Sequence, residues 1–375
     1  MTRLTIFVRY AIVLWAVAGP PGAAQETDRA SDGAADSALV SAPITRFIPA
    51  DDRTEHRIDY SFWSDVLEKF VVSMGPPLRR NPNINGKMPP RFGHNSLYRL
   101  DGSMFAFSFV NEPVIEAFSQ YRRDLEGVAD TLDIPSLPRN EQLAYWLNLH
   151  NVALVEQIAK AWPARLPRKI SIEGVPLDAA KIVTINGVPL SARDIRTRIV
   201  YPNWKDPRVI YGFWRGEIGG PAIRRKAFHS NSVSDMLDRA AKEFINSRRG
   251  TEKRGKTMHV STLYAEAAQF YFPDLERDLR SHLLKFTDEE ITKRLAKTER
   301  FKLTLRERDI ADLAGGTSRN AYWPREQVGA GVIALMGQRS KKFDFIERKG
   351  LRTGEVIFTE IELPGSEANS QKEIE

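Results

Sequence analysis

The chain of 375 residues contains no cysteine. This absence excludes disulfide bonds, thiol nucleophiles, thiolate metal ligands and iron–sulfur clusters. Histidine is also scarce, and its six copies are scattered without the i, i+4 spacing that places two metal ligands on one helix face. The sequence therefore predicts neither a metal site nor a cofactor, and the fold must rest on its hydrophobic core.

Long apolar runs are scarce too. The run over residues 11–18 follows Arg3 and Arg9 and leads to the small residues at 22–24. This order is typical of a secretory signal peptide, which we predict as residues 1–24. An uncleaved anchor is the alternative, but the run is short for a span that needs about 20 apolar residues. We expect an exported, periplasmic protein whose mature chain has no transmembrane segment.

The two terminal segments carry few large apolar side chains. Residues 25–54 are expected to be a flexible lead, and residues 366–375 a disordered tail. The chain as a whole is 42% hydrophobic and 27% charged, which suits a packed globular protein. We therefore expect a main domain over residues 55–300. Residues 301–365 form a C-terminal extension that either packs on that domain or is a separate small unit.

The balance of charge is mildly basic. The formal net charge is +7, and removal of the signal peptide with its two arginines leaves 7 − 2 = +5. This excess favours anionic partners such as acidic glycans, although a solvated basic face is the simpler explanation. No nucleic-acid-binding motif is present, so nucleic acid is not an expected partner.

Apolar side chains recur at helical spacing in several segments. The pattern predicts helices over residues 60–74, 139–162 and 233–249. The aromatic run that begins at Asp206 reads as a strand before a glycine-rich turn, and residues 342–363 resemble a hairpin. Strands do not alternate regularly with helices. The sequence therefore predicts a helix-dominated α+β fold with a small β-sheet rather than a doubly wound sheet.

A short tandem duplication follows the central helix. Residues 170–182 and 183–195 each contain a β-like triplet, a glycine turn and Val-Pro-Leu. Asp178 and Ser191 then stand where each copy would cap a helix, and Ser191 with Asp194 has the spacing of a capping box. Two copies are too few for a solenoid, so we expect a paired local unit.

Several separated motifs occur in one order: Tyr60 and Trp63, residues 140–151, 190–195, 206–213, 220–224 and 243–246. This set resembles the bacterial and plant family called domain of unknown function 547, over about residues 55–290. The resemblance implies a scaffold similar to the papain and transglutaminase type of thiol hydrolase. It also implies a histidine and two cysteines after the Asp-Pro-Arg motif. A gapless comparison assigns Ile210, Arg215 and Gly220 to those positions, so this chain lacks the thiols.

The central helix carries polar side chains where its neighbours are apolar. Asn148 and Asn151 follow Tyr145-Trp146, as the resembled family's motif does, and lie on one helix face. A buried amide without partners costs about 1–3 kcal/mol, so we expect the two side chains to hold the glycine-rich segment. Ligand contact is the alternative. His150 is expected to be partly exposed.

The remaining candidates divide between binding and catalysis. We expect a polar network, binding or structural, of Trp146, Asn148, Asn151, Arg208, Arg215 and Arg224. The run over residues 215–225 either presents amides and arginines to an anion or is a simple turn. Glu217 and His259 are the weak catalytic candidates, and their convergence beside the central helix would favour an enzyme.

Three functions remain open. The first is a non-catalytic binding or structural module on the family scaffold. The second is a hydrolase that acts on amide bonds of peptides or cell-wall material with a non-thiol site. The third is adhesion to an anionic glycan through arginines that include Arg79, Arg80 and Arg91, with another envelope protein as the other candidate partner.

Overall fold

The structure is a computed structural model that describes residues 44–50, 54–79, 94, 96–316 and 325–350. The predicted signal peptide, most of the predicted lead, Arg80, Arg91 and the predicted C-terminal tail lie outside these residues. No helix in the described ranges is long and apolar enough to span a membrane.

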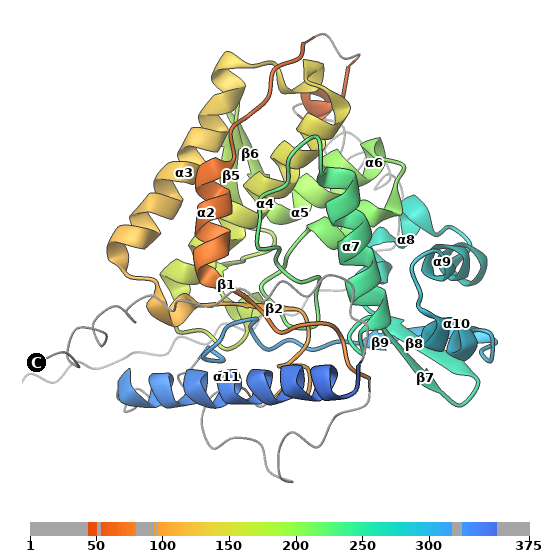
Figure 1. The fold of residues 1–375 in the computed structure, drawn as a ribbon. Coiled ribbons are helices and arrows are strands. Elements are labelled where there is room, and N and C mark those ends of the chain that lie inside the picture. Colours follow the sequence, from red (N-terminus) through yellow and green to blue (C-terminus); the bar gives the residue numbers. More distant parts are fainter. Residues whose placement is uncertain (1–43, 51–53, 80–93, 95, 317–324, 351–375) are drawn as a thin grey trace, which may run out of the picture. The chain divides into compact units, whose positions relative to one another are not determined.

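Helices dominate the described residues (Figure 1). The α-helices are α2 (Ser61–Phe70), α3 (Glu112–Thr131), α4 (Arg139–Ala161), α5 (Ala192–Asp194), α6 (Tyr201–Asn203), α7 (Val233–Asn246), α8 (Leu263–Tyr271), α9 (Leu275–Leu284), α10 (Glu289–Leu295) and α11 (Arg325–Arg348). Five 3₁₀ segments are η1 (Ile44–Phe47), η2 (Phe107–Phe109), η3 (Ile134–Ser136), η4 (Pro167–Lys169) and η6 (Pro207–Gly212), and η5 (Ile195–Val200) is a π-helical segment.

The strands form small separate sheets. Three are two-stranded and antiparallel: β1 (Val71–Ser73) with β2 (Ser103–Phe105), β3 (Ser171–Ile172) with β4 (Val175–Pro176), and β5 (Lys181–Ile185) with β6 (Val188–Ser191). The fourth has the order β7 (Thr251–Arg254), β8 (Thr257–Ser261), β9 (Arg300–Leu305), and its β8–β9 pair is parallel. The predicted α+β fold is confirmed.

Helix α4 lies in the middle of the core. Nearly every side chain from Glu141 to Ile158 is buried, so the helix is enclosed on all sides. Helix α3 packs along it, and the rings of Phe47 and Tyr145 meet Trp146 edge-to-face at 5.3 and 5.0 Å. A helix with such surroundings must satisfy its polar side chains with protein partners.

The tandem segment forms two hairpins, β3–β4 and β5–β6, and a helix follows only the second of them. The predicted capping box is confirmed, because Ser191 Oγ accepts the Asp194 N–H and the Asp194 carboxylate accepts the Ser191 N–H. The corresponding prediction for Asp178 is wrong. No helix follows Asp178, whose carboxylate instead accepts hydrogen bonds from Arg193 and Arg196.

Two segments have a secondary structure that differs from the prediction. One follows helix α2, and the other precedes the glycine-rich turn. Residues 71–73, expected to be helical, pair as strand β1 with β2. The aromatic run after Asp206 is the 3₁₀ segment η6 rather than a strand. Its residues 209–212 are all buried, and an apolar run that is buried on every side has no periodicity that separates a strand from a helix.

The C-terminal part of the chain packs against earlier segments. Strand β9 pairs with β8, and Lys342 on α11 donates to the carbonyls of Met74 (2.8 Å) and Leu100 (2.5 Å). The hairpin predicted over residues 342–363 is wrong for residues 342–348, which belong to helix α11. Over residues 329–348 of α11, the buried side chains recur every three or four residues: Val332, Leu335, Gln338, Lys342 and Ile346. Two of these five side chains are polar, so the pattern of apolar residues alone does not reveal the helix.

Candidate functional site

Asn148 ties α4 to the segment after the glycine-rich turn. Its Nδ2 donates to the Phe228 carbonyl at 2.8 Å, and its Oδ1 accepts the Phe228 N–H at 3.0 Å. The buried side chain of Asn148 thus satisfies both the backbone N–H and the backbone carbonyl of Phe228. Because the backbone of Phe228 has no strand partner, this amide takes the place of a sheet neighbour.

Asn151, one turn later on α4, also donates one hydrogen bond to the backbone and accepts another from it. Its Nδ2 donates to the Gly212 carbonyl and its Oδ1 accepts the Trp214 N–H, both at 3.0 Å. The Oδ1 atom also lies 3.0 Å from Nδ1 of His150. The two asparagines therefore hold the backbone on either side of residues 215–220, where the family resemblance places its two thiols.

His150 is fully buried, which contradicts the expected partial exposure. Its Nε2 lies 3.1 Å from Nη1 of Arg196, and a guanidinium only donates, so Nε2 is the acceptor. The ring proton is then on Nδ1 and is donated to Asn151. Burial lowers the pKa of His150 to about 3, and the Arg196 charge adds to the shift. This imidazole is neutral, and both of its nitrogens are engaged.

Arg196 connects the histidine to two carboxylates. The guanidinium has no solvent exposure; it donates to both oxygens of Glu266 at 2.9 and 3.0 Å and to Asp178 at 2.8 Å. Burial alone would lower the pKa of Arg196, but the bonds to Glu266 outweigh it and raise that pKa. Helix α8 supplies Glu266, and the turn after β4 supplies Asp178, so three distant segments meet at this arginine.

Arg215 completes the arginine–carboxylate cluster, defined here as Asp178, Arg196, Arg215 and Glu266. It donates to the two Glu266 oxygens at 2.6 and 3.2 Å. Burial favours the neutral acid, but Arg215 and Arg196 together hold the pKa of Glu266 far below its ordinary value. At neutral pH the cluster has two cations and two anions, and it is partly open to solvent at Asp178, Arg215 and Glu266.

The two catalytic candidates are not brought together. Glu217 is half-buried beside the cluster, and its carboxylate makes no hydrogen bond within the described part of the chain. Burial raises the pKa of Glu217 to about 7, which Arg168 and Arg215 oppose. His259 is on β8, where its Nδ1 lies 2.6 Å from Thr304 Oγ1. No hydrogen bond joins Glu217 to His259 in the residues described.

The predicted polar network divides into separate environments. Trp146 packs among aromatic rings, and its buried Nε1 has no partner among the described residues. Arg208 pairs with Asp206 and Asp238 in a half-exposed position, away from the cluster's contacts. Arg224 makes neither a hydrogen bond nor an ion pair within the ranges described. Of the six predicted residues, only Asn151 and Arg215 are joined by continuous hydrogen bonds among the residues described, through His150, Arg196 and Glu266.

The amides of the glycine-rich turn are engaged by the protein: Ile218 donates to Asp309 (2.9 Å), Gly219 to Glu307 (3.0 Å) and Gly220 to Glu217 (3.1 Å). A Cβ at Gly219 would lie 2.4 Å from the Glu307 carbonyl oxygen, so only glycine fits there. This close approach accounts for the glycine as part of a simple turn. It leaves these three amides no free N–H for an anion.

The glycan candidate Arg79 is also engaged inside the protein. It donates to the carbonyls of Asn246 and Ser247 at 3.0 Å each and to Thr251 Oγ1 at 2.5 Å. Burial lowers the pKa of Arg79 to about 10. Among the residues described, no group of three acidic or histidine side chains is arranged to hold a metal ion.

Arg196 and Glu266 were not among the residues expected from the sequence. A weak signal exists for each: Arg196 stands among Ile195, Ile199 and Val200, and Glu266 is the single acid of a mostly apolar helix. A charged side chain on an apolar face indicates a buried partner. The sequence does not say which of many acids and bases that partner is.

Comparison with curated proteins and with solved structures finds no match, so the likeness to papain or transglutaminase folds stays a prediction. A family model described as "Protein of unknown function, DUF547" matches residues 134–245. The matched segment includes Asn148, Asn151, Arg196 and Arg215, whereas Glu266 lies beyond it. The segment that holds most of the site is therefore similar to the DUF547 family, and it contains no cysteine.

Proposed function

We propose that this is an exported protein in which the DUF547 scaffold acts as a non-catalytic binding or structural module. The observation that carries the proposal is the state of Arg215. The family resemblance assigns this position to the first cysteine, and here the side chain is held on Glu266 by two hydrogen bonds. A charge-neutral ion-pair cluster stands where thiol chemistry would require a nucleophile.

The neighbouring groups support the same proposal. Nucleophilic catalysis needs a nucleophile and a base within hydrogen-bond reach. The buried apolar side chain of Ile210 stands at the position that the resemblance gives to histidine. His150, the imidazole nearest to the cluster, has both nitrogens occupied. Neither position offers a group that could take a proton from a substrate.

The test is a hydrolysis assay on the mature protein. We expect no cleavage of amide bonds when it is incubated with a mixture of short peptides or with peptidoglycan, and no product above that of a heat-denatured sample. Mass spectrometry of the products is the measurement. Cleavage that depends on the folded protein would refute the non-catalytic proposal.

One observation favours the alternative, a hydrolase acting on amide bonds with a non-thiol site. Glu217 has a pKa raised by burial to about 7, which suits general acid–base catalysis near neutral pH. If cleavage occurs, Glu217→Gln should reduce its rate by about 100-fold or more. The control is Glu299→Gln, because Glu299 is exposed and its carboxylate pairs with Lys256 alone within the described ranges. Equal rates in the two variants would eliminate Glu217 as the catalytic group.

Export gives a separate expected result. When the full chain is produced in a bacterium, the mature protein should begin at Gln25 and be found in the periplasmic fraction. Leu14→Arg breaks the apolar run, so this variant should keep residues 1–24 and stay in the cytoplasm. Intact-mass measurement of each fraction distinguishes the two forms. A wild-type protein that keeps its first 24 residues would show that the segment is not a cleaved signal.

A further inference from the structure

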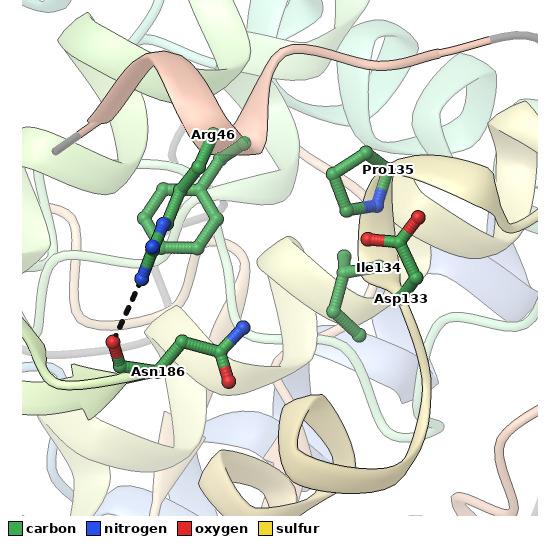
Figure 2. Close-up of a pocket in the computed structure, with 6 residues that line it drawn as sticks. Arg46, Asp133, Ile134, Pro135 and Asn186 are labelled. Atoms are coloured by element: carbon green, nitrogen blue, oxygen red, sulfur yellow. Dashed lines mark hydrogen bonds between the residues drawn. The ribbon is translucent and has the colours of Figure 1, made fainter. Parts of the chain in front are cut away.

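A second hollow lies away from the arginine–carboxylate cluster. It is a pocket of about 340 Å³ lined by Arg46, Phe47, Asp133, Ile134, Pro135 and Asn186. These residues come from η1, from the start of η3 and from the β5–β6 turn. Figure 2 shows Arg46 and Asn186 on one side of the pocket and Asp133, Ile134 and Pro135 on the other. The volume is at the lower end for ligand sites, which limits an occupant to a small molecule.

The two sides carry opposite charges that do not pair with each other. Arg46 donates through Nη1 to the Asn186 carbonyl at 2.9 Å, and its guanidinium forms no ion pair with a carboxylate in the described residues. Asp133 precedes η3 without capping it, and within the same residues its carboxylate accepts no hydrogen bond. Both side chains are exposed, so a ligand in solution can reach them.

The remaining walls are apolar and held from behind. Phe47 and Ile134 are buried, with 2% of each residue's surface exposed. Gln142 of α4 donates from Nε2 to the carbonyls of Pro135 (2.9 Å) and Leu137 (2.7 Å), which fixes η3 in place. The pocket is therefore built before any ligand binds, and binding need not order these walls.

The turn that supplies Asn186 is also fixed by its backbone. Asn186 has φ 48° and Gly187 has φ 75°, the two positive values that an Asn-Gly hairpin turn requires. The conformation points the Asn186 carbonyl at Arg46, where it accepts the Nη1 hydrogen. This contact uses one N–H of the guanidinium and leaves its other donors for an anionic group.

We propose that this pocket binds a zwitterion of the size of an amino acid or dipeptide. Its carboxylate pairs with Arg46, its ammonium pairs with Asp133, and its apolar side chain lies against Pro135 and the small exposed edges of Phe47 and Ile134. A simple anion would meet the repulsion of Asp133, and a simple cation that of Arg46. A neutral ligand would leave both charges without a counterion. The proposal goes beyond the proposed module and does not depend on the absence of catalysis.

Isothermal titration of the mature protein with alanyl-leucine tests the assignment. We expect saturable binding that weakens by about tenfold or more in Arg46→Gln and in Asp133→Asn, because each variant removes one charge-assisted contact. The matched control is Arg123→Gln, since Arg123 is also exposed and belongs to α3, which does not line the pocket. It should bind like the wild type.

Blocked ligands test the same contacts without altering the protein. N-acetyl-alanyl-leucine lacks the ammonium, so it should bind the wild type about tenfold more weakly and be no weaker with Asp133→Asn. Alanyl-leucine amide lacks the carboxylate, so it should bind the wild type about tenfold more weakly than alanyl-leucine does. Its affinity should not fall further in Arg46→Gln. Failure of alanyl-leucine and of free leucine to bind at millimolar concentration would overturn the proposal. Binding that both pocket variants retain in full would do so as well.

Discussion

Arg196→Met should lower the free energy of unfolding by about 3 kcal/mol, at the lower end of the range for removing one partner of a buried ion pair. The substitution keeps much of the side chain's length but leaves Glu266 with only Arg215 and leaves the acceptor nitrogen of His150 unsatisfied. Chemical denaturation at pH 7, followed by tryptophan fluorescence, measures the loss. A variant within 1 kcal/mol of the wild type would show that Arg196 is not the hub of a buried network.

The control is Arg193→Met, because Arg193 pairs with the same carboxylate, Asp178, from an exposed position. An exposed pair contributes about 0–1 kcal/mol, so this variant should be close to the wild type. The pH dependence gives a second check. The pKa of Glu266 is depressed in the folded protein, so its contribution is present above its unfolded pKa of about 4.3 and declines as the pH falls below that value. The difference in the free energy of unfolding between the wild type and Arg196→Met should therefore become smaller as the pH falls below about 4.3.

Asn151→Leu should lower the free energy of unfolding by at least about 3 kcal/mol, since leucine fills a similar volume but satisfies none of the amide's partners. The buried groups left without a partner are the Gly212 carbonyl, the Trp214 N–H and the Nδ1–H of His150. Each costs about 1–3 kcal/mol, and because they are neighbours the sum is not additive. Denaturant titration measures the change, and near-ultraviolet circular dichroism reports the environment of Trp214.

Asn140→Leu is the matched control for this result. Asn140 lies in the first turn of the same helix, is exposed and makes no side-chain hydrogen bond within the described part of the chain. Substitution there should change stability by no more than about 0.5 kcal/mol. Equal effects at residues 140 and 151 would mean that helix propensity, and not the buried amide, accounts for the loss.

The helices that could be predicted are those with an uninterrupted apolar pattern. The central helix was expected over residues 139–162 and is α4, Arg139–Ala161, because a long apolar segment that stops at Pro163 allows little else. Helix α7 was likewise predicted from its regular face. The errors fell on segments whose burial is not periodic or not apolar, such as η6 and the Gln338 and Lys342 positions of α11.

The site was only half predictable for a related reason. The sequence indicates that Asn148 and Asn151 need partners, because an amide inside an apolar helix is costly alone. It does not identify Phe228, Gly212 or Trp214, since backbone groups look the same at every residue. The expected exposure of His150 was wrong because its surroundings are supplied by segments that follow it by tens of residues.

The sequence by itself determined what chemistry is absent. Without cysteine no thiolate can form, and Arg215 occupies the place that the family resemblance gives to one. Only the tertiary structure decided where the charges go. Arg196 and Glu266 are 70 residues apart, and they pair because the fold buries Arg196 completely beside the partly exposed Glu266. Local sequence sets which side chains need partners, but long-range packing chooses the partners.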